Sequence, residues 1–383
     1  MVAVRRFHKE AMNILALNWN DLKNPYAGGA EVHLESLLRR LVTYGHRVTL
    51  VCSGWPGCPE EETIEGIRII RRGRRLYFNL VVPSLLRDLV KREKFDVLVE
   101  DINKIPFYTP LYLKLNTLVV IPHLFATTVF QEINPVIGSY IYLAEKPLLQ
   151  VYGRFPFNVI SESTADDMVA RGLPRNQVSV IHCGIDRGTF FPSPTTIKYD
   201  RPTILYLGRI KKYKGIQHLI LAFKKVKARI PDARLMIVGA GDYQPSLHSL
   251  TQSLELTSDV EFPGFVPVAD KVERLRRSHV CVLPSIREGW GLTNIEANAV
   301  GTTVVAANSP GLRDSVRHGE TGFLYEYGNT GELADRLIEI LGDEALRKRL
   351  ESGGLAWAEK FSWDDAARKF EKLLVEITEK GRS

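Results

Sequence analysis

The feature that most constrains the fold is a repeated alternation of short apolar runs with segments of helical periodicity. Most runs are continuous rather than alternating with polar residues, which is typical of parallel strands buried on both faces. Strand–helix–strand repetition predicts parallel sheets wound in right-handed units. Strands are expected at 13–19, 47–53, 95–101, 117–123, 157–163, 178–182, 203–209, 234–241, 280–285 and 302–308, and helices at 31–44, 215–230 and 271–278.

The alternation lapses once, at 191–196, where proline, serine and threonine replace it. At roughly 150 residues per domain, the 383 residues are enough for two or three domains. We therefore expect an α/β protein with two doubly wound, Rossmann-like domains, 1–190 and 200–355, and a cleft between them. A last segment, 356–383, holds a helix over 364–378 that no strand follows.

Composition excludes several classes of protein. Apolar residues make up 45% and charged residues 25%, as in a globular protein, and a net charge of +7 is too small to indicate nucleic-acid binding. We expect no secretory signal and no membrane span, because the N-terminus lacks an apolar core and Pro122 interrupts the longest apolar stretch. The four cysteines are Cys52, Cys58, Cys183 and Cys281. They show neither zinc nor thioredoxin spacing, which favours a reduced, cytoplasmic location and predicts no metal site.

The first candidate site is the glycine pair Gly28 and Gly29, between an expected strand and an expected helix. Glycines at a helix N-terminus expose backbone N–H groups, which suit a phosphate or another anion. A flexible loop that leads into a helix is the alternative.

The second candidate follows the strand at 203–209. Arg209 ends this strand and Lys214 precedes a helix, so both lie at the carboxyl edge of the sheet, where open α/β sheets bind ligands. Two cations at that edge suit a diphosphate, and arginine offers a bidentate fork. The alternative is a solvated basic loop.

The third candidate carries the strongest signal. A strand ends at Ser285, a glycine-bearing turn follows, and a helix begins near Leu292. Glu288 lies in the turn, and Glu296 lies about one turn into the helix. Both carboxylates can face one cleft, and a carboxylate near a helix start suits a vicinal diol such as ribose. Glu296 could otherwise be a surface acid of the helix.

Two further features were weighed beside these. The segment 238–244 begins like a dinucleotide-binding glycine motif, but Gln244 replaces the third glycine and no acid follows at the expected distance, which disfavours a dehydrogenase. His123 ends a strand at the carboxyl edge, and a role in the cleft is slightly favoured over that of a structural histidine.

Taken in order, these motifs resemble glycosyltransferase family 4, retaining enzymes of the GT-B fold that use nucleotide sugars. Glu288 and Glu296 are spaced like the family's E-x7-E signature, and 208–215 resembles its diphosphate site. Pro263–Val266 resembles the base-binding turn, and Gly184–Asp186 resembles the end of the N-terminal domain. The final helix resembles the one that crosses back to that domain.

The resemblance implies transfer of a hexose from a nucleotide-diphosphate sugar, UDP-sugar first and GDP-mannose next, to a glycan or lipid-linked acceptor with retention, in polysaccharide or glycolipid synthesis. It implies no cofactor and no metal. The implied catalytic residues are His123, Arg209, Lys214 and Glu288. The implied donor-binding residues are Gly28, Gly29, Gly208, Arg209, Lys214, Gly264, Phe265, Val266, Glu288, Gly289, Trp290, Gly291, Leu292 and Glu296.

The chain departs from the family pattern at three places, which bear on the sugar and the acceptor. Leu124 stands where an acid often follows His123, Gly301 lacks the usual nearby proline, and Asp314 stands where glutamate is usual. A sugar-nucleotide epimerase and a phosphorylase are rival enzymes, and a non-catalytic nucleotide-sugar-binding protein is a third alternative. The intact Arg209 and Glu288 argue against the last.

Residues 68–94 form a basic stretch with interleaved apolar residues. Nine basic and two acidic residues give 9 − 2 = +7, as large as the excess of the whole chain. Such a stretch predicts peripheral contact with an anionic inner membrane face, where a lipid-linked acceptor would lie. A helix packed on the N-terminal sheet with a solvated basic rim is nearly as favoured.

Overall fold

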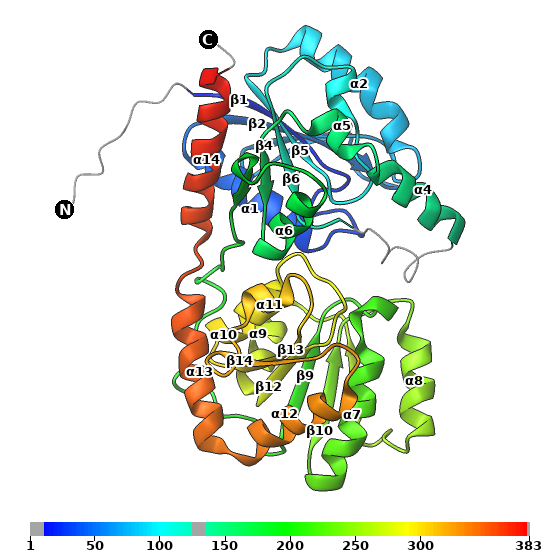
Figure 1. Cartoon of the computed structure of the whole chain (residues 1–383), viewed down its shortest axis with the longest axis vertical. Helices are drawn as coiled ribbons and strands as arrows, with labels where there is room; N and C mark the ends of the chain where they lie inside the picture. The colour runs from blue at the N-terminus through cyan, green and yellow to red at the C-terminus, as the bar shows by residue number, and fades with distance from the viewer. Residues whose placement is uncertain (1–10, 125–134, 381–383) are drawn as a thin grey trace, which may run out of the picture.

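A computed structural model describes residues 11–124 and 135–380 and contains two α/β domains stacked along the long axis of the molecule (Figure 1). The N-terminal domain holds an 8-stranded sheet in the order β3-β4-β2-β1-β5-β6-β7-β8. All its neighbouring strands are parallel except β3 and β4. Its strands are β1 (Asn13–Leu17), β2 (Arg47–Gly54), β3 (Glu61–Ile64), β4 (Ile67–Arg74), β5 (Val97–Asp101), β6 (Thr117–Ile121), β7 (Phe157–Val159) and β8 (Val178–Val180).

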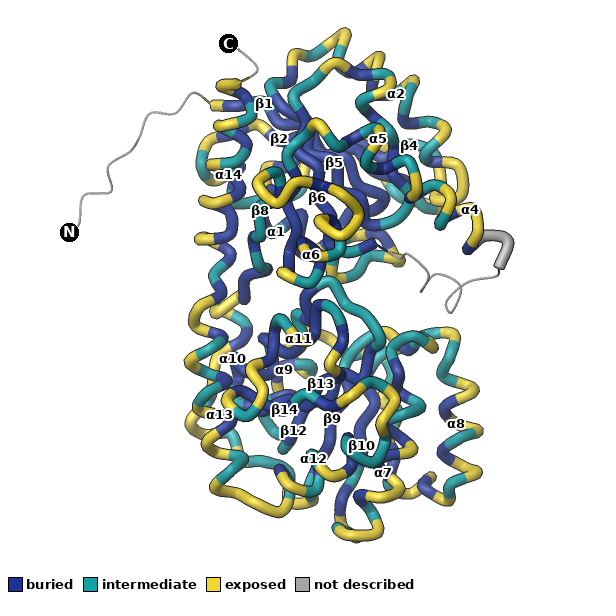
Figure 2. Tube along the Cα trace, in the orientation of Figure 1, coloured by how far each residue is buried: buried dark blue, intermediate teal, exposed yellow. Residues whose placement is uncertain are grey.

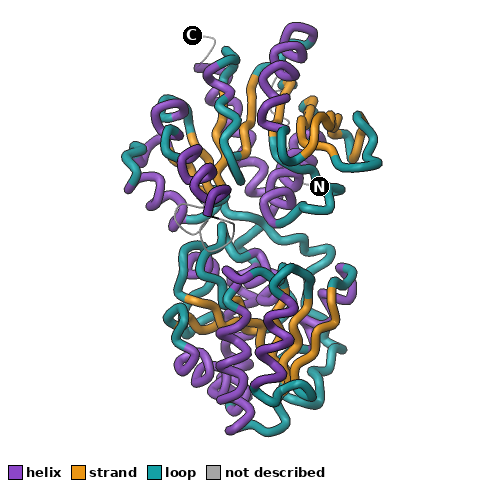
Figure 3. Tube along the Cα trace, turned by 90° about the vertical axis from the view of Figure 1, so that its right-hand side faces the viewer, coloured by secondary structure: helices purple, strands orange, loops and turns teal. Residues whose placement is uncertain are grey.

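The C-terminal domain holds a 6-stranded parallel sheet in the order β11-β10-β9-β12-β13-β14. Its strands are β9 (Thr203–Leu207), β10 (Arg234–Val238), β11 (Val260–Gly264), β12 (Val280–Leu283), β13 (Thr303–Ala307) and β14 (Gly322–Tyr325). In both domains most strands are buried, the edge strands β3 and β11 are partly exposed, and the outer turns of the helices are exposed (Figure 2). The view turned by 90° shows each sheet lined by helices (Figure 3).

Helices connect the strands in both domains. Those of the N-terminal domain are α1 (Gly29–Thr43), α2 (Phe78–Arg92), α4 (Pro135–Glu145), α5 (Leu148–Tyr152) and α6 (Glu162–Ala170). Those that follow are α7 (Ile216–Arg229), α8 (Gln244–Ser253), α9 (Val268–Arg277), α10 (Leu292–Ala299), α11 (Leu312–Ser315), α12 (Thr330–Gly342), α13 (Glu344–Ala358) and α14 (Trp363–Lys380).

All ten strands expected from the sequence form, and four further strands were missed. β11 was missed because it is an edge strand in which only Val260 is buried, so it lacks a continuous apolar run. β7 is shorter than expected because the Ser161 side chain accepts a hydrogen bond from the backbone N–H of Thr164 and thereby caps α6. The other missed strands are β3, β4 and β14.

The basic stretch 68–94 is not one amphipathic element. Its first part is strand β4, where Arg68 pairs with Glu61 and Glu93. Its second part is α2, whose apolar side is buried in the N-terminal core through Phe78, Val82, Leu86 and Leu89. The arrangement matches the second interpretation, a packed helix with a basic rim. Among residues 11–124 and 135–380, no helix is long and apolar enough to cross a bilayer.

The C-terminal helix returns to the N-terminal domain, as the resemblance implied (Figure 1). α14 packs on α1, and Arg40 Nε lies 2.5 Å from Asp364 Oδ1. The chain passes between the domains twice at one place, because Ile185 forms a parallel bridge with Ser362. A Cβ at Gly184 would lie 2.1 Å from the backbone nitrogen of Trp363, so only glycine fits there.

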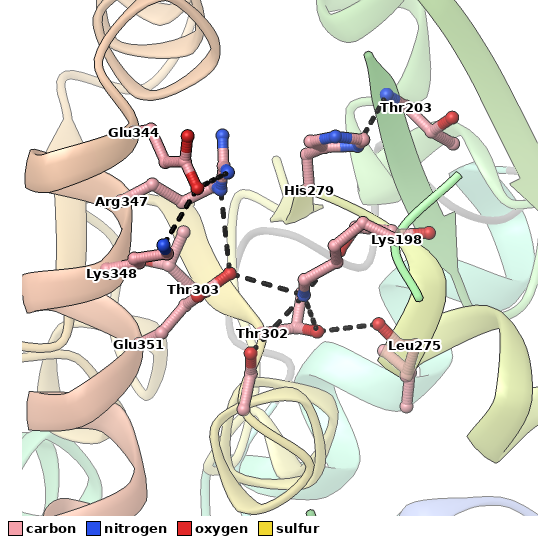
Figure 4. A network of polar contacts seen from close by, with 12 residues as sticks. Lys198, Thr203, Leu275, His279, Thr302, Thr303, Glu344, Arg347, Lys348 and Glu351 are labelled. Carbon is pink, nitrogen blue, oxygen red and sulfur yellow. Dashed lines mark hydrogen bonds and ion pairs between the residues drawn. The ribbon is translucent and has the colours of Figure 1, made fainter. Parts of the chain in front are cut away.

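The predicted boundary at 356 falls in the last turn of α13, which packs on α10 of the C-terminal domain. Lys198 lies at the amino edge of the C-terminal sheet. Its Nζ donates hydrogen bonds to the carbonyl oxygens of Ser278 and Gly301 and to the hydroxyl of Thr302 (Figure 4). It also pairs with Glu351 of α13 at 3.2 Å. This lysine joins the incoming linker, the sheet and α13.

Candidate functional site

We call the facing edges of the two domains the walls of the cleft. The C-terminal wall is built from loops at the carboxyl ends of β9 and β12. Gly215 has a φ of +68°, and a Cβ there would lie 2.0 Å from the carbonyl oxygen of Pro284. The backbone N–H of Ile286 donates to the carbonyl of Tyr213 at 3.1 Å. These contacts fix the Arg209–Lys214 loop against the Glu288 loop.

Lys214 and Glu288 form an ion pair, with side chains 13% and 18% exposed. Burial would raise the pKa of Glu288, but the Lys214 ammonium and hydrogen bonds from Lys214 and Ser285 hold that pKa below its ordinary value. Burial would lower the pKa of Lys214, and Glu288 keeps it raised instead. Both groups are therefore charged at neutral pH.

A second loop holds Glu288 from behind. The backbone N–H of Glu288 donates to the carbonyl of Pro310 at 3.1 Å, and Ser309 Oγ donates to the carbonyl of Ser285 at 2.8 Å. Gly311 has a φ of +81°, and a Cβ there would lie 2.1 Å from the carbonyl oxygen of Glu288. Sequence reasoning assigned this loop no role in holding the site.

Arg209 faces the glycine pair across the cleft. A Cβ at Gly28 would lie 3.5 Å from Cζ of Arg209, and one at Gly29 would lie 3.8 Å from Cδ1 of Leu292. Arg209 is exposed and forms no ion pair with the residues that the structure describes. Because Gly28 precedes the N-terminus of α1, a guanidinium and backbone N–H groups converge there, as an anion site requires.

Glu296 lies on α10 and pairs with Lys271 of α9 at 2.6 Å. Gly264 ends β11 with a φ of +77°, and Phe265 after it is 85% exposed. An exposed aromatic ring at the carboxyl edge is free to stack on a planar ligand. Gly208 begins the Arg209 loop beside Tyr206, whose hydroxyl donates to the carbonyl of Arg209 at 2.8 Å.

The side chain of Trp290 does not face the cleft, which corrects the expectation that it lines the donor site. It is 2% exposed and stacks on His182 at a ring-centroid distance of 4.3 Å. Phe361 meets it edge-on at 5.2 Å. Trp290 therefore packs where the chain passes between the domains, and its buried indole N–H has no hydrogen-bond partner among the described residues.

His123 lies opposite Glu288, two residues after β6. Burial lowers the pKa of His123 to about 4, although the Glu288 carboxylate acts in the opposite direction. The imidazole is therefore neutral at pH 7. Gly289 packs closely on the residue before His123, because a Cβ at Gly289 would lie 3.1 Å from the carbonyl oxygen of Pro122.

The glycines of 238–244 have a structural role. A Cβ at Gly239 would lie 1.9 Å from the carbonyl oxygen of Gly208, and one at Gly241 would lie 2.0 Å from that of Ile210. They let the β10 loop pack on the backbone of the Arg209 loop. The sequence-based rejection of a dinucleotide motif is consistent with this role.

The N-terminal wall contains residues that sequence reasoning missed. Glu31 Oε2 accepts a hydrogen bond from the backbone N–H of Gly28 at 2.7 Å, and Glu31 Oε1 accepts one from Asn20 at 2.9 Å. The spacing of Gly28 and Glu31 is that of a capping box, which could have identified this acid. The walls also meet directly, because Arg287 lies 3.3 Å from Asp167 of α6.

Two family models match the chain in succession. Residues 27–188 match Glycosyltransferase Family 4, and residues 189–357 match Glycosyl transferases group 1. A GDP-mannose-dependent alpha-(1-6)-phosphatidylinositol monomannoside mannosyltransferase of Mycobacterium tuberculosis is 25% identical over 95% of this chain and 98% of its own.

Two solved structures share the fold over nearly the whole chain. Sucrose-phosphate synthase from Thermosynechococcus elongatus gives a TM-score of 0.82 at 22% identity, covering 95% of this chain and 99% of its own. HepE from Anabaena, solved in complex with UDP-glucose, gives 0.78 at 18% identity, covering 95% and 100%. At these identities the likeness establishes the fold, which is GT-B.

Proposed function

The chain belongs to the GT-B glycosyltransferases of the group 1, family 4 type, and we propose on this basis that it transfers a hexose from a nucleotide-diphosphate sugar with retention at the anomeric carbon. The observation that carries this proposal is the position of Arg209, opposite Gly28 at the N-terminus of α1 and on the loop of the Lys214–Glu288 pair. A UDP-sugar is the first candidate donor and GDP-mannose the second. The UDP-glucose complex of HepE and the name of the mycobacterial relative support testing both.

Each group has a role that follows from its surroundings. Arg209, the α1 N-terminus and Lys214 would stabilise the charge that develops on the diphosphate as the bond to the anomeric carbon breaks. Because Lys214 is already neutralised by Glu288, the largest uncompensated charge is that of Arg209.

The other groups would bind the rest of the donor. Glu296 would accept hydrogen bonds from the ribose diol, and the Phe265 ring would stack on the base. Glu288 and the backbone of 289–292 would hold the sugar, beside the neutral His123. An acceptor hydroxyl would attack from the face that the diphosphate leaves, which retains the configuration.

Binding measurements test the donor assignment. Isothermal titration with UDP, UDP-glucose, GDP and GDP-mannose, in buffer that contains EDTA, should give tighter binding for one base and no dependence on a divalent metal. Arg209→Met should weaken binding of that nucleotide, and Lys211→Met should not, because Lys211 on the same loop pairs with Asp242 at 2.6 Å. Equal affinity of both variants for every nucleotide would contradict the assignment.

Product analysis separates the proposal from its rivals. A transferase releases a nucleoside diphosphate in proportion to glycosylated acceptor. An epimerase releases none in the presence of acceptor, and a phosphorylase requires inorganic phosphate or pyridoxal phosphate. Binding of the nucleotide sugar without any turnover would instead indicate a non-catalytic binding protein.

We further propose that the acceptor is a glycan or lipid-linked molecule that the protein meets at an anionic membrane surface. Support comes from exposed apolar side chains where α2 begins: Leu76 is 94% exposed and Leu80 is 75% exposed. Arg74 and Arg75 are exposed beside them. Asn79 Nδ2 donates a hydrogen bond to the Tyr140 hydroxyl at 3.2 Å. The half-exposed ring of Tyr140, which lies on α4, therefore belongs to the same surface.

Liposome co-sedimentation tests this surface. The protein should bind anionic vesicles at low salt and not neutral ones. Replacing Leu76 and Leu80 by serine should weaken binding, while Ile197→Ser, at a 77% exposed position outside this surface, should not. Binding unaffected by the double variant would exclude this surface.

A further inference from the structure

Polar atoms without hydrogen-bond partners gather on the N-terminal wall of the cleft. Both carboxyl oxygens of Asp101, Oδ1 of Asn20, Oδ1 of Asn103 and Nζ of Lys104 are buried and have no hydrogen-bond partner among the described residues. Asn20 follows β1, Asp101 ends β5, and Asn103 and Lys104 follow β5; because β1 and β5 are neighbours in the sheet, these residues lie at one carboxyl edge. Buried polar groups are normally paired, so each such group needs an explanation.

The contrast with Lys198 shows how unusual Lys104 is. Lys198 also lies largely inside the protein, and its ammonium group contacts three oxygen acceptors and Glu351 (Figure 4). The ammonium group of Lys104 has no such acceptor, and its nearest described acid is Glu31, with Oε1 at 3.9 Å. Glu31 already accepts hydrogen bonds from Gly28 and Asn20.

Two further cations, Arg75 and Arg209, lie near Lys104. Burial is the main cause that lowers the pKa of Lys104 to about 8; Glu31 and Asp101 act against this shift, and Arg75 and Arg209 act with it. The Arg75 guanidinium lies 4.5 Å from the ring centroid of the half-exposed Tyr26. Three cations therefore surround this part of the cleft, and an anion bound there would relieve their repulsion.

Asp101 differs from a carboxylate that binds a cation. Burial and the Glu31 charge raise the pKa of Asp101 well above its ordinary value, which favours the protonated carboxyl group. A neutral carboxyl group can both donate to and accept from a hydroxyl, and the oxygens of Asn20 and Asn103 accept from hydroxyls. Together they match a ligand that carries several hydroxyl groups.

We propose that these residues form an acceptor subsite for a polyol that carries a phosphate group. The hydroxyls would face Asp101 and Asn103, and the phosphate would meet Lys104 and Arg75. The subsite rests on the proposed function, in which Arg209 across the cleft binds the donor diphosphate. Arg209 and Leu292 of the opposite domain meet this wall at Gly28 and Gly29, so the ligand would enter when the domains separate.

Saturation-transfer NMR on the full chain with saturating UDP tests the subsite. The probes are sn-glycerol 3-phosphate and glycerol, and the first alone should give a signal. Lys104→Met should weaken its binding about tenfold, the loss of one charge-assisted hydrogen bond. Arg75→Met, at an exposed position, provides a second variant that should also weaken it. Lys114→Met is the matched control, because Lys114 is exposed and precedes β6 at the opposite edge of the sheet.

The outcomes separate this proposal from the function it rests on. If UDP does not bind in titration, the proposed function is contradicted. The subsite is then judged separately, by whether binding of sn-glycerol 3-phosphate depends on Lys104. Vesicles of phosphatidylglycerol distinguish a lipid headgroup from a soluble acceptor: binding to vesicles alone that needs Lys104 assigns a lipid source. No binding of either form, equal binding of glycerol, or equal losses in Lys104→Met and Lys114→Met would overturn the subsite.

Discussion

The two walls of the cleft place a buried carboxyl group in opposite environments. On the C-terminal wall, Glu288 is ion-paired with Lys214, and its pKa is held below the ordinary value despite burial. On the N-terminal wall, Asp101 has no hydrogen-bond partner among the described residues, and burial raises its pKa. One wall is preorganised by its own charges, and the other leaves polar groups for a ligand to pair.

The backbone differs in the same way. The C-terminal loops are held by glycines that allow no side chain, such as Gly215 against Pro284 and Gly311 against Glu288. On the N-terminal wall, side-chain hydrogen bonds from Asn20 and Asn103 do this work. The difference indicates that the C-terminal wall is held by its own backbone, while polar groups of the N-terminal wall are left unpaired.

The largest effect should come from Arg209→Ala. Losing a cation that acts on the departing diphosphate should lower kcat by a factor of about 10²–10³, or about 3–4 kcal/mol, with a smaller change in KM. Lys211→Ala on the same loop is the control and should retain activity. Steady-state kinetics give the answer, and unchanged turnover in Arg209→Ala would remove the diphosphate site from this wall.

Glu288→Gln and Asp101→Asn test the contrast between the walls through stability. Glu288→Gln leaves Lys214 unpaired and should cost about 2–3 kcal/mol at pH 7, somewhat less than a fully buried pair. Because the pKa of Glu288 is depressed on folding, its contribution is present above about pH 4.5 and is lost as the pH falls through the folded pKa.

The contribution of Asp101 to the free energy of unfolding should change with pH in the opposite direction, which Asp101→Asn tests. The raised pKa of Asp101 makes its contribution to stability fall as the pH rises above 3.8, the ordinary value, toward the folded pKa. The variant should therefore be as stable as the wild type, or more stable, at pH 7. Urea unfolding of both variants between pH 4 and 8 measures this, and parallel pH profiles would refute the contrast.

Glu296→Ala should weaken binding of bare UDP about tenfold, because a carboxylate–hydroxyl hydrogen bond to the ribose would be lost. Glu288→Ala should spare bare UDP and weaken UDP-sugar binding. Glu273→Ala, an exposed acid on α9, is the control. Calorimetry with the two ligands separates the cases, and equal losses for both ligands in both variants would mean that the two acids are misassigned.

The smallest effect should come from one of the contacts that join the walls. Arg287 and Asp167 lie 3.3 Å apart and are partly exposed, so Asp167→Ala should cost about 0.5–1 kcal/mol in unfolding free energy. The same change should shift the small-angle scattering curve toward more separated domains. A loss of several kcal/mol would mean that this bridge, rather than α14, holds the domains together.

The sequence could indicate which residues of the C-terminal wall lie together, because they stand at strand ends marked by glycines; their role in donor binding stays a prediction. Arg209, Lys214 and Glu288 are brought together as expected. Trp290 was misplaced because its partners, His182 and Phe361, are distant in sequence and only the folded chain brings them to its ring.

The N-terminal wall could not be predicted in the same way. Asp101 ends an apolar run, and Lys104 follows it without a glycine or any recognisable spacing. Their significance comes from burial and from missing partners, which depend on the packing of β1 against β5. The division of residues 68–94 into a strand and a helix likewise depends on the pairing of β4 with β2 and β3.

A crystal structure of the complex with UDP tests the central claim most directly. We predict that the β-phosphate lies within hydrogen-bond distance of the Arg209 guanidinium and the Lys214 ammonium, opposite the N-terminus of α1 at Gly29, with the ribose at Glu296. A diphosphate bound away from both Arg209 and Lys214 would contradict the account.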